Sequence, residues 1–218
     1  MVYEEDLQHE GLRILVEKPG FTYGSDAVLL ANFLRAKPGE QVLDIGCGTG
    51  ILSILASAKT GAHFTAVDIQ PRMCELCAVS VRLNGQQDAI SVLLADIRTL
   101  HEQLGHECFD AAVCNPPYFS GGTQSPDAQR QLSRHQDACT ITDVALCAKR
   151  MLKNGGRLYL CYPAPLFAQA CAALVEHRLE PKRVRPATQG NAAPYLTLIE
   201  AKKGGKPGLV WEESTHGR

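Results

Sequence analysis

Short apolar runs alternate along this chain with longer segments in which apolar positions recur at helical spacing. Uninterrupted apolar runs bounded by turn residues are typical of strands buried on both faces of a sheet, and the longer periodic segments are typical of helices. The pattern predicts seven strands, of which 182–186 has the weakest signal: Gln41–Ile45, His63–Asp68, Ile90–Ala95, Asp110–Cys114, Arg157–Tyr162, Lys182–Pro186 and Tyr195–Glu200. It also predicts five helices: Asp26–Arg35, Gly50–Lys59, Arg72–Asn84, Thr142–Leu152 and Pro165–His177.

Strands that alternate with helices predict an α/β fold with a doubly wound, mostly parallel sheet. The chain has 218 residues, which suits one domain over 1–218. A polar connection between 115 and 140 is much longer than the others, and such loops often carry function. The segment 203–218 begins with Lys and Gly residues, so we expect a flexible tail.

Composition limits the candidate functions without selecting one. Hydrophobic residues make up 45% and charged residues 21%, and the formal net charge is −1, so any nucleic-acid contact must come from a local patch. The N-terminus is acidic, without the basic and apolar regions of a secretory signal, and the apolar run Leu158–Val175 is broken by prolines; we expect a cytoplasmic protein. The nine cysteines suggest buried free thiols, and Cys74 and Cys77 lack a second ligand pair, so no metal is expected.

A glycine-rich turn follows the first predicted strand. The segment is Asp44-Ile45-Gly46-Cys47-Gly48-Thr49-Gly50, and a helix follows it. Glycines in this position let the backbone turn tightly and let a ligand approach the main chain. Asp68 ends the next strand, where it can accept both hydroxyls of a ribose, and Asp96 ends the third, where it can accept from an adenine amino group.

The spacing of the glycines favours S-adenosylmethionine over a dinucleotide. A dinucleotide site would have Gly-x-Gly-x-x-Gly opposite a pyrophosphate, which the carboxylate of Asp44 would repel. That carboxylate suits the cationic amino-acid end of S-adenosylmethionine. The alternative for each acid is a helix cap, and Asp96 in particular could cap a helix over 97–103.

The fourth strand leads directly into Asn115-Pro116-Pro117-Tyr118. Two prolines fix the backbone and remove two donors, which leaves the carbonyls of Asn115 and Pro116 as acceptors beside the Asn115 side-chain oxygen. Acceptors aimed at the N–H bonds of a planar amine can direct its lone pair at a methyl group, and Tyr118 offers a ring for stacking. This tetrapeptide predicts a catalytic site for amine methylation, and the alternative is a rigid turn with an incidental tyrosine.

The glycine turn, Asp68 and Asn115–Tyr118, in that order, resemble the gamma-type amino-methyltransferases. The stretch Phe21–Leu30, Phe119 and Gly155–Leu158 narrow the resemblance to the tRNA1(Val) (adenine-37 N6)-methyltransferase family. The resemblance implies a Rossmann-like class I fold with seven strands, the last antiparallel, and S-adenosylmethionine as cofactor. It also implies that 1–36 covers the cofactor and that Tyr23, Gly24 and Asp26 lie beside it. The alternative for this stretch is a helix start, with Ser25 as N-cap and Asp26 in the first turn.

The resemblance implies methylation of the N6 amine of an anticodon-loop adenosine in tRNA. Two alternatives stay open: the same chemistry on guanine N2 of RNA or on a protein glutamine, and a scaffold that binds the cofactor without catalysis. Several residues could contact the substrate, although solvated surface charge is the alternative for each of the basic ones. They are Phe119, Arg130, Arg134, Lys182, Arg183 and Arg185.

Overall fold

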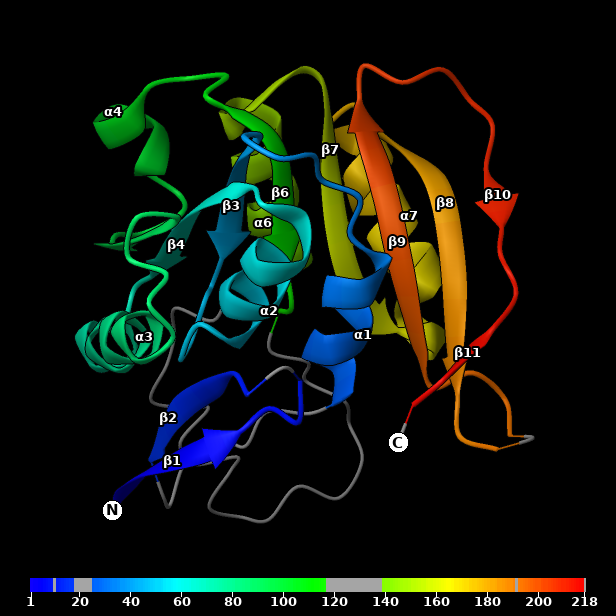
Figure 1. Ribbon diagram of the computed structural model, residues 1–218. Helices are drawn as coiled ribbons and strands as arrows, with labels where there is room; N and C mark the ends of the chain where they lie inside the picture. The colour runs from blue at the N-terminus through cyan, green and yellow to red at the C-terminus, as the bar shows by residue number, and fades with distance from the viewer. Residues whose placement is uncertain (10, 18–24, 117–138, 191, 218) are drawn as a thin grey trace, which may run out of the picture.

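A twisted central sheet forms the middle of the protein (Figure 1). The structure, a computed structural model, describes residues 1–9, 11–17, 25–116, 139–190 and 192–217. In this part of the chain the sheet has nine strands, in the order β10-β8-β9-β7-β6-β3-β4-β5, with β11 also paired to β8. The strands are β3 (Gln41–Ile45), β4 (His63–Asp68), β5 (Ile90–Leu94), β6 (Phe109–Cys114), β7 (Leu152–Pro163), β8 (Leu179–Thr188), β9 (Leu196–Lys203), β10 (Val210–Trp211) and β11 (Thr215–His216).

The pairing confirms the predicted α/β fold. β5, β4, β3, β6 and β7 pair in parallel, and β9 is antiparallel to both β7 and β8. All seven predicted strands are present, and the last of them, β9, is the antiparallel one. The weakly predicted strand around 182–186 proves longer, because β8 spans ten residues.

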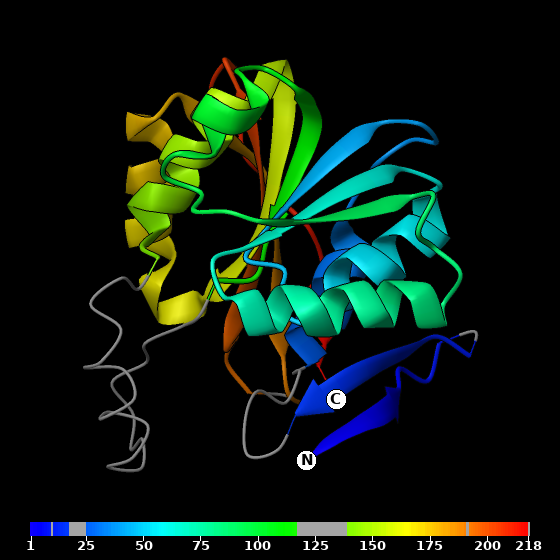
Figure 2. The same cartoon turned by 90° about the vertical axis from the view of Figure 1, so that its left-hand side faces the viewer.

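Helices cover both faces of the sheet, which gives three layers (Figure 2). One face is covered by α1 (Ser25–Phe33), α2 (Ile51–Thr60) and α3 (Pro71–Leu83), whose buried residues share one apolar cluster with Val113, Tyr159 and Cys161. The other face is covered by α4 (Leu100–Leu104), α6 (Ile141–Met151), the 3₁₀ turn η1 (Ala164–Leu166) and α7 (Phe167–Glu176). Because side chains alternate along a strand, each central strand supplies both clusters.

Local sequence explains where two of the helices begin. Pro71 occupies the first turn of α3, where its missing N–H leaves no bond unmade. At α6, Thr140 and Asp143 form a capping box: the Thr140 hydroxyl accepts from the Asp143 N–H, and the Asp143 carboxylate accepts from the Thr140 N–H.

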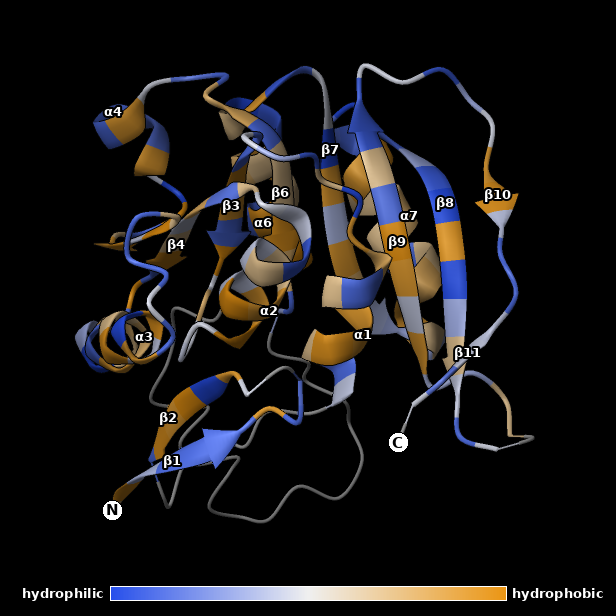
Figure 3. Ribbon diagram, in the orientation of Figure 1, coloured by the Kyte–Doolittle hydropathy of each residue, from blue (hydrophilic) through white to orange (hydrophobic). Residues whose placement is uncertain are grey.

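An antiparallel hairpin precedes α1 and was not predicted from the sequence. β1 (Val2–Asp6) pairs with β2 (Arg13–Glu17), and β2 lies against α3. The Leu15 N–H donates to the Ser80 hydroxyl at 2.9 Å, and Arg72 bonds both carboxylate oxygens of Glu17 at 3.0 Å. β1 is mostly hydrophilic (Figure 3), so its pattern does not indicate a buried strand.

The end of the chain, predicted as a flexible tail over 203–218, pairs with the sheet in the structure. β10 and β11 pair in parallel with the open edge of β8, and Glu212 between them makes ion pairs with Arg35, Arg183 and Arg185. The Lys- and Gly-rich composition indicated flexibility, because it does not reveal that these residues pair with β8, a strand that lies earlier in the sequence. In the described part of the chain, no helix is both long and apolar enough to cross a membrane, and no cluster of His, Cys, Asp or Glu side chains could hold a metal ion.

Candidate functional site

The candidate site lies where β3, β4, β5 and β6 end. These strands are parallel, so their carboxyl ends meet at one edge of the sheet. Ile45 is the register partner of both Val67 and Cys114, and Asp68 is the partner of Leu94. The residues that follow these positions, including Gly46, Asp96 and Asn115, are therefore brought to the same edge.

The glycine turn is built on positive backbone angles. Gly46, Gly48 and Gly50 have φ of +74°, +54° and +91°, which L side chains rarely adopt. The N–H groups of Gly46 and Cys47 both donate to the Val67 carbonyl at 2.9 Å, and the Ile54 N–H donates to the Gly50 carbonyl as α2 begins. Among the described residues, and apart from the adjacent ones in the chain, no atom lies within 4 Å of a Cβ added at Gly46 or Gly48, so this part of the chain leaves room for a ligand directly against the backbone.

Asp68 fixes the turn to the end of β4. Its Oδ2 accepts from the Gly48 N–H and its Oδ1 from the Gln70 N–H, both at 2.9 Å, and the residue is 6% exposed. Each carboxylate oxygen has two lone pairs, so these bonds orient the carboxylate without using its full accepting capacity. Its predicted role, binding ribose hydroxyls, is compatible with this geometry and stays a prediction.

Asp44 lies beneath the turn and is almost completely buried. The Ser53 hydroxyl donates to its Oδ2 at 2.6 Å. Burial raises the pKa of this carboxyl to about 7, against the opposing effect of the Ser53 hydrogen bonds, and nearby Asp68 raises it further. Removal from water disfavours the charged form. Its predicted role beside the ammonium group of the cofactor stays a prediction.

Asp96 follows β5, and its carboxylate is engaged by Arg98. The Arg98 guanidinium makes bonds of 2.6–3.0 Å to both oxygens, and the Arg98 N–H donates to Oδ1 at 2.9 Å. The hydrogen bond from Arg98 lowers the pKa of Asp96. Asp96 does not cap a helix over 97–103, since α4 begins at Leu100 with Thr99 as N-cap. To contact an adenine amine as predicted, the Asp96 carboxylate must accept from that amine in addition to the Arg98 guanidinium, or in place of it.

Asn115 and Pro116 follow β6, beside the start of the glycine turn. The Cys161 thiol donates to the Asn115 Oδ1 at 3.0 Å, and Pro116 is buried. Pro117 and Tyr118, the rest of the predicted catalytic tetrapeptide, lie outside the described residues. So do Tyr23 and Gly24, two of the residues that the resemblance places near the cofactor.

Asp26, the third of those residues, lies in the first turn of α1. Its Oδ1 accepts from the Tyr195 hydroxyl at 3.4 Å, and burial raises its pKa. α1 contacts β7, β9 and α2, the helix that follows the glycine turn. Whether it contacts a cofactor stays a prediction.

The basic residues of β8 have partners within the protein, and their predicted role in substrate binding stays a prediction. Arg183 is 7% exposed, ion-paired with Glu200 and Glu212, and its guanidinium stacks 3.8 Å from the centre of the Phe33 ring. Arg185 pairs with Glu212, and the Lys182 amine donates to the Lys206 carbonyl. Phe119, Arg130 and Arg134, the other predicted substrate residues, lie outside the described residues.

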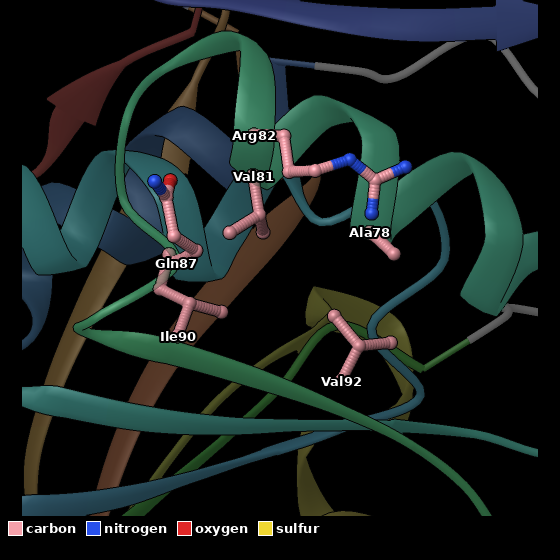
Figure 4. A pocket seen from close by; sticks show the side chains of 6 residues that line it. All are labelled: Ala78, Val81, Arg82, Gln87, Ile90 and Val92. Carbon is pink, nitrogen blue, oxygen red and sulfur yellow. The ribbon is translucent and has the colours of Figure 1, made fainter.

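A shallow groove of about 300 Å³ lies elsewhere, between α3 and β5 (Figure 4). Ile90 and Val92 from the first half of β5 form its floor, which is away from the strand ends that carry the candidate site. It contains none of the predicted site residues. Its lining is mainly apolar: Ala78, Val81, Arg82, Gln87, Ile90 and Val92.

Two residues of the site were not predicted from the sequence. Ser53 bonds Asp44 from the first turn of α2, and Cys161 bonds Asn115 from β7. The signal for Ser53 was available, because a side chain three residues after Gly50 faces back toward the strand end. Cys161 could be found only from the pairing of β6 with β7.

Known proteins share both the sequence pattern and the fold. The family described as "Methyltransferase domain" matches residues 36–201. The tRNA1(Val) (adenine(37)-N6)-methyltransferase of Aliivibrio salmonicida is 31% identical over 66% of this chain and 61% of its own length. The protein of that name from Tolumonas auensis is 31% identical over 87% of this chain and 79% of its own length.

A solved structure of similar fold is that of a predicted O-methyltransferase from Agrobacterium tumefaciens. It has a TM-score of 0.71 at 21% identity, covering 88% of this chain and 86% of its own. At this identity the structural similarity indicates only a shared fold, whereas the sequence matches show the family. The chain therefore belongs to the S-adenosylmethionine-dependent methyltransferases, in the family of the tRNA1(Val) (adenine(37)-N6)-methyltransferases.

Proposed function

We propose that this protein methylates the exocyclic N6 amine of an adenine in the anticodon loop of a tRNA, with S-adenosylmethionine as methyl donor. The observation that carries the proposal is the register of β3 with β6. Ile45 pairs with Cys114, so Asn115 lies beside Gly46 at the start of the glycine turn. A methyl donor held on the turn and an amine held by Asn115 would then be neighbours.

The residues at this edge fit S-adenosylmethionine. The space above Gly46 and Gly48 can admit a ligand, Asp68 presents a buried and oriented carboxylate for ribose hydroxyls, and Asp44 suits a cationic group. Asp68 and Asp44 both lie near the turn, and a bound cofactor that carries an ammonium and a sulfonium would favour the charged form of the buried Asp44 carboxyl. When bound, S-adenosylmethionine supplies an electrophilic methyl carbon and a neutral leaving group.

The protein contributes position and electrostatics to the transfer. An adenine amine is a weak nucleophile because its lone pair is delocalised into the ring. The Asn115 side-chain oxygen would accept a hydrogen bond from one N–H group of the adenine amine. This bond would favour the geometry in which the lone pair of the amine nitrogen faces the methyl group. The proton lost after transfer can pass to water, so no general base is needed.

The choice of tRNA rests on the relatives, whose name specifies adenine 37 of tRNA1(Val). An anticodon loop suits a protein of this charge, because its bases are already unpaired and little duplex needs to be gripped. Phe119, Arg130 and Arg134 follow Tyr118 in the sequence, and we place the substrate contacts with them rather than with the paired arginines of β8.

The test is to incubate the protein with unmodified tRNA and labelled S-adenosylmethionine, digest the RNA and identify the labelled nucleoside by mass spectrometry. N6-methyladenosine is the expected product. N2-methylguanosine, or label in protein, would contradict the adenine assignment. Binding of the cofactor with no transfer to RNA or protein would favour a scaffold.

Asn115→Ala separates binding from chemistry. The rate of transfer should fall at least about 100-fold, as expected for a positioned polar group at a reacting centre, while the calorimetric affinity for S-adenosylmethionine stays within about twofold. Asn154→Ala is the matched control, because Asn154 is exposed at the start of β7, at the opposite end of the sheet. A rate within about tenfold of the parent would remove Asn115 from the reaction.

A further inference from the structure

The side chain of Asn115 is held by a buried thiol. Cys161 lies in β7 with no exposed surface, and its Sγ is 3.0 Å from the Asn115 Oδ1. A thiol can donate its proton to an amide oxygen. The bond is therefore directional, and it connects the neighbouring strand to the oxygen that the proposed function assigns to the target amine.

Strand geometry brings the two residues together. β6 and β7 are parallel, and Cys114 is the register partner of Leu160, so Asn115 and Cys161 are the next positions along the pair. Val113 and Cys161 belong to the same apolar cluster, which includes residues of α1 and α2. Because side chains two apart in a strand share a face, Asn115 and Cys161 both point toward the face of the sheet that α1 and α2 cover.

We propose that Cys161 is a positioning residue for methyl transfer, acting through Asn115; this inference rests on the proposed function. Rotation of an amide about its last side-chain torsion is only weakly restricted. A donor fixed in β7 selects the rotation in which the oxygen, rather than the amide nitrogen, faces Cys161. A thiol is a weak donor, so it orients the oxygen without competing strongly with the amine of the substrate.

The test compares Cys161→Ala, which removes the donor, with Cys161→Ser, which keeps one. With cofactor and tRNA saturating, the single-turnover rate of Cys161→Ala should fall about fivefold, within the range that a neutral hydrogen bond supports. Cys161→Ser should return the rate to within about twofold of the parent. The affinity for S-adenosylmethionine should be unchanged in both variants, because Cys161 is not assigned to the cofactor.

Cys147→Ala is the matched control for loss of a buried thiol. Cys147 is 1% exposed in α6, on the opposite face of the sheet, so its truncation should lower the thermal midpoint about as much as Cys161→Ala and leave the rate unchanged. An equal loss of rate in both alanine variants, or no recovery with serine, would show that Cys161 is merely structural.

A double-mutant cycle separates this inference from the proposed function. If Cys161 acts through Asn115, adding Cys161→Ala to Asn115→Ala should cause no further loss of rate. A further fivefold loss in that background would overturn the inference. If Asn115→Ala alone left the rate intact, the catalytic role of Asn115 would fail first; if it abolished transfer while Cys161→Ala did not slow it, only the positioning role would fail.

Discussion

At the scale of single residues, Asp44 shows how the fold changes the chemistry of one side chain. The carboxyl lies under the glycine turn, where burial outweighs the Ser53 hydrogen bond and raises its pKa to about 7 from 3.8. Between these two pH values the folded protein binds more protons at Asp44 than the unfolded chain does. The contribution of Asp44 to the free energy of unfolding therefore falls as pH rises through this window and is constant above it.

Asp44→Asn should remove this pH dependence. We expect the free energy of unfolding of the variant, minus that of the parent, to rise between about pH 4 and pH 7 and then to level off. Urea titrations of the two cofactor-free proteins across this range measure the difference, and the other acids cancel because both proteins contain them. Two curves that stay parallel would mean that Asp44 keeps an ordinary pKa.

Gly46 and Gly85 allow a second test with a control built into the chain. Both have positive φ, +74° and +64°, and a Cβ at either position would meet nothing within 4 Å in the part of the chain that the structure describes. Alanine should therefore destabilise the fold by a similar amount at both positions, about 1–2 kcal/mol. Gly85 follows α3 at the end of the sheet away from the site.

The two alanine variants should differ in cofactor binding. At Gly46 the added methyl group would occupy space that we assign to S-adenosylmethionine, so calorimetry should show an affinity at least about tenfold weaker, a loss of about 1.4 kcal/mol. Gly85→Ala should bind like the parent. Equal affinities for the two variants would place the cofactor away from the turn.

At the scale of elements, the C-terminal strands and β8 stabilise one another. Glu212 follows β10 and pairs with Arg183 and Arg185, while Arg183 also donates to the Phe33 carbonyl at the end of α1. In β8 a hydrophobic band lies between hydrophilic ones (Figure 3), and its two arginines lie over the Phe33 ring of α1. The end of the chain therefore neutralises cations that β8 and α1 enclose.

Glu212→Gln should weaken this junction. The variant retains the side-chain volume but leaves Arg183 and Arg185 with less compensating charge, and we expect a loss of about 1–2 kcal/mol in the free energy of unfolding. Glu213→Gln, a change at the exposed neighbouring carboxylate, should be nearly neutral. Urea unfolding measures both, and equal effects would mean that the ion pairs do not stabilise the protein.

At the scale of the whole molecule, the sequence predicted what periodicity and local motifs encode. Buried strands, covering helices and the acids at the strand ends all follow from residues close in sequence. The partners of Arg183 do not, because Glu212 lies 29 residues away and is brought to it by the pairing of β10 with β8. The hairpin β1–β2 was not predicted for a similar reason. β1 is acidic and has no apolar pattern of its own, and it is joined to the fold because it pairs with β2, which packs against α3.

The charge of the whole protein yields a last prediction, on RNA binding. The net charge is −1, and Arg183, Arg185 and Lys203 are ion-paired with Glu200, Glu212 and Glu107. We assign the phosphate contacts mainly to the sequence after Tyr118, where the proposed substrate residues Arg130 and Arg134 lie. Each phosphate neutralised on a single strand contributes a slope of about −0.7 to the logarithm of affinity against the logarithm of salt concentration. We expect a slope of about −2 for tRNA, measured by fluorescence anisotropy from about 50 to about 300 mM salt.

Duplex RNA of equal length is the control for this prediction. Because the predicted contacts lie in one segment of the sequence, the one after Tyr118, duplex RNA should bind more weakly than tRNA under every condition. A slope of about −5 or steeper, shared by duplex and tRNA, would mean that a broad basic surface binds the RNA instead.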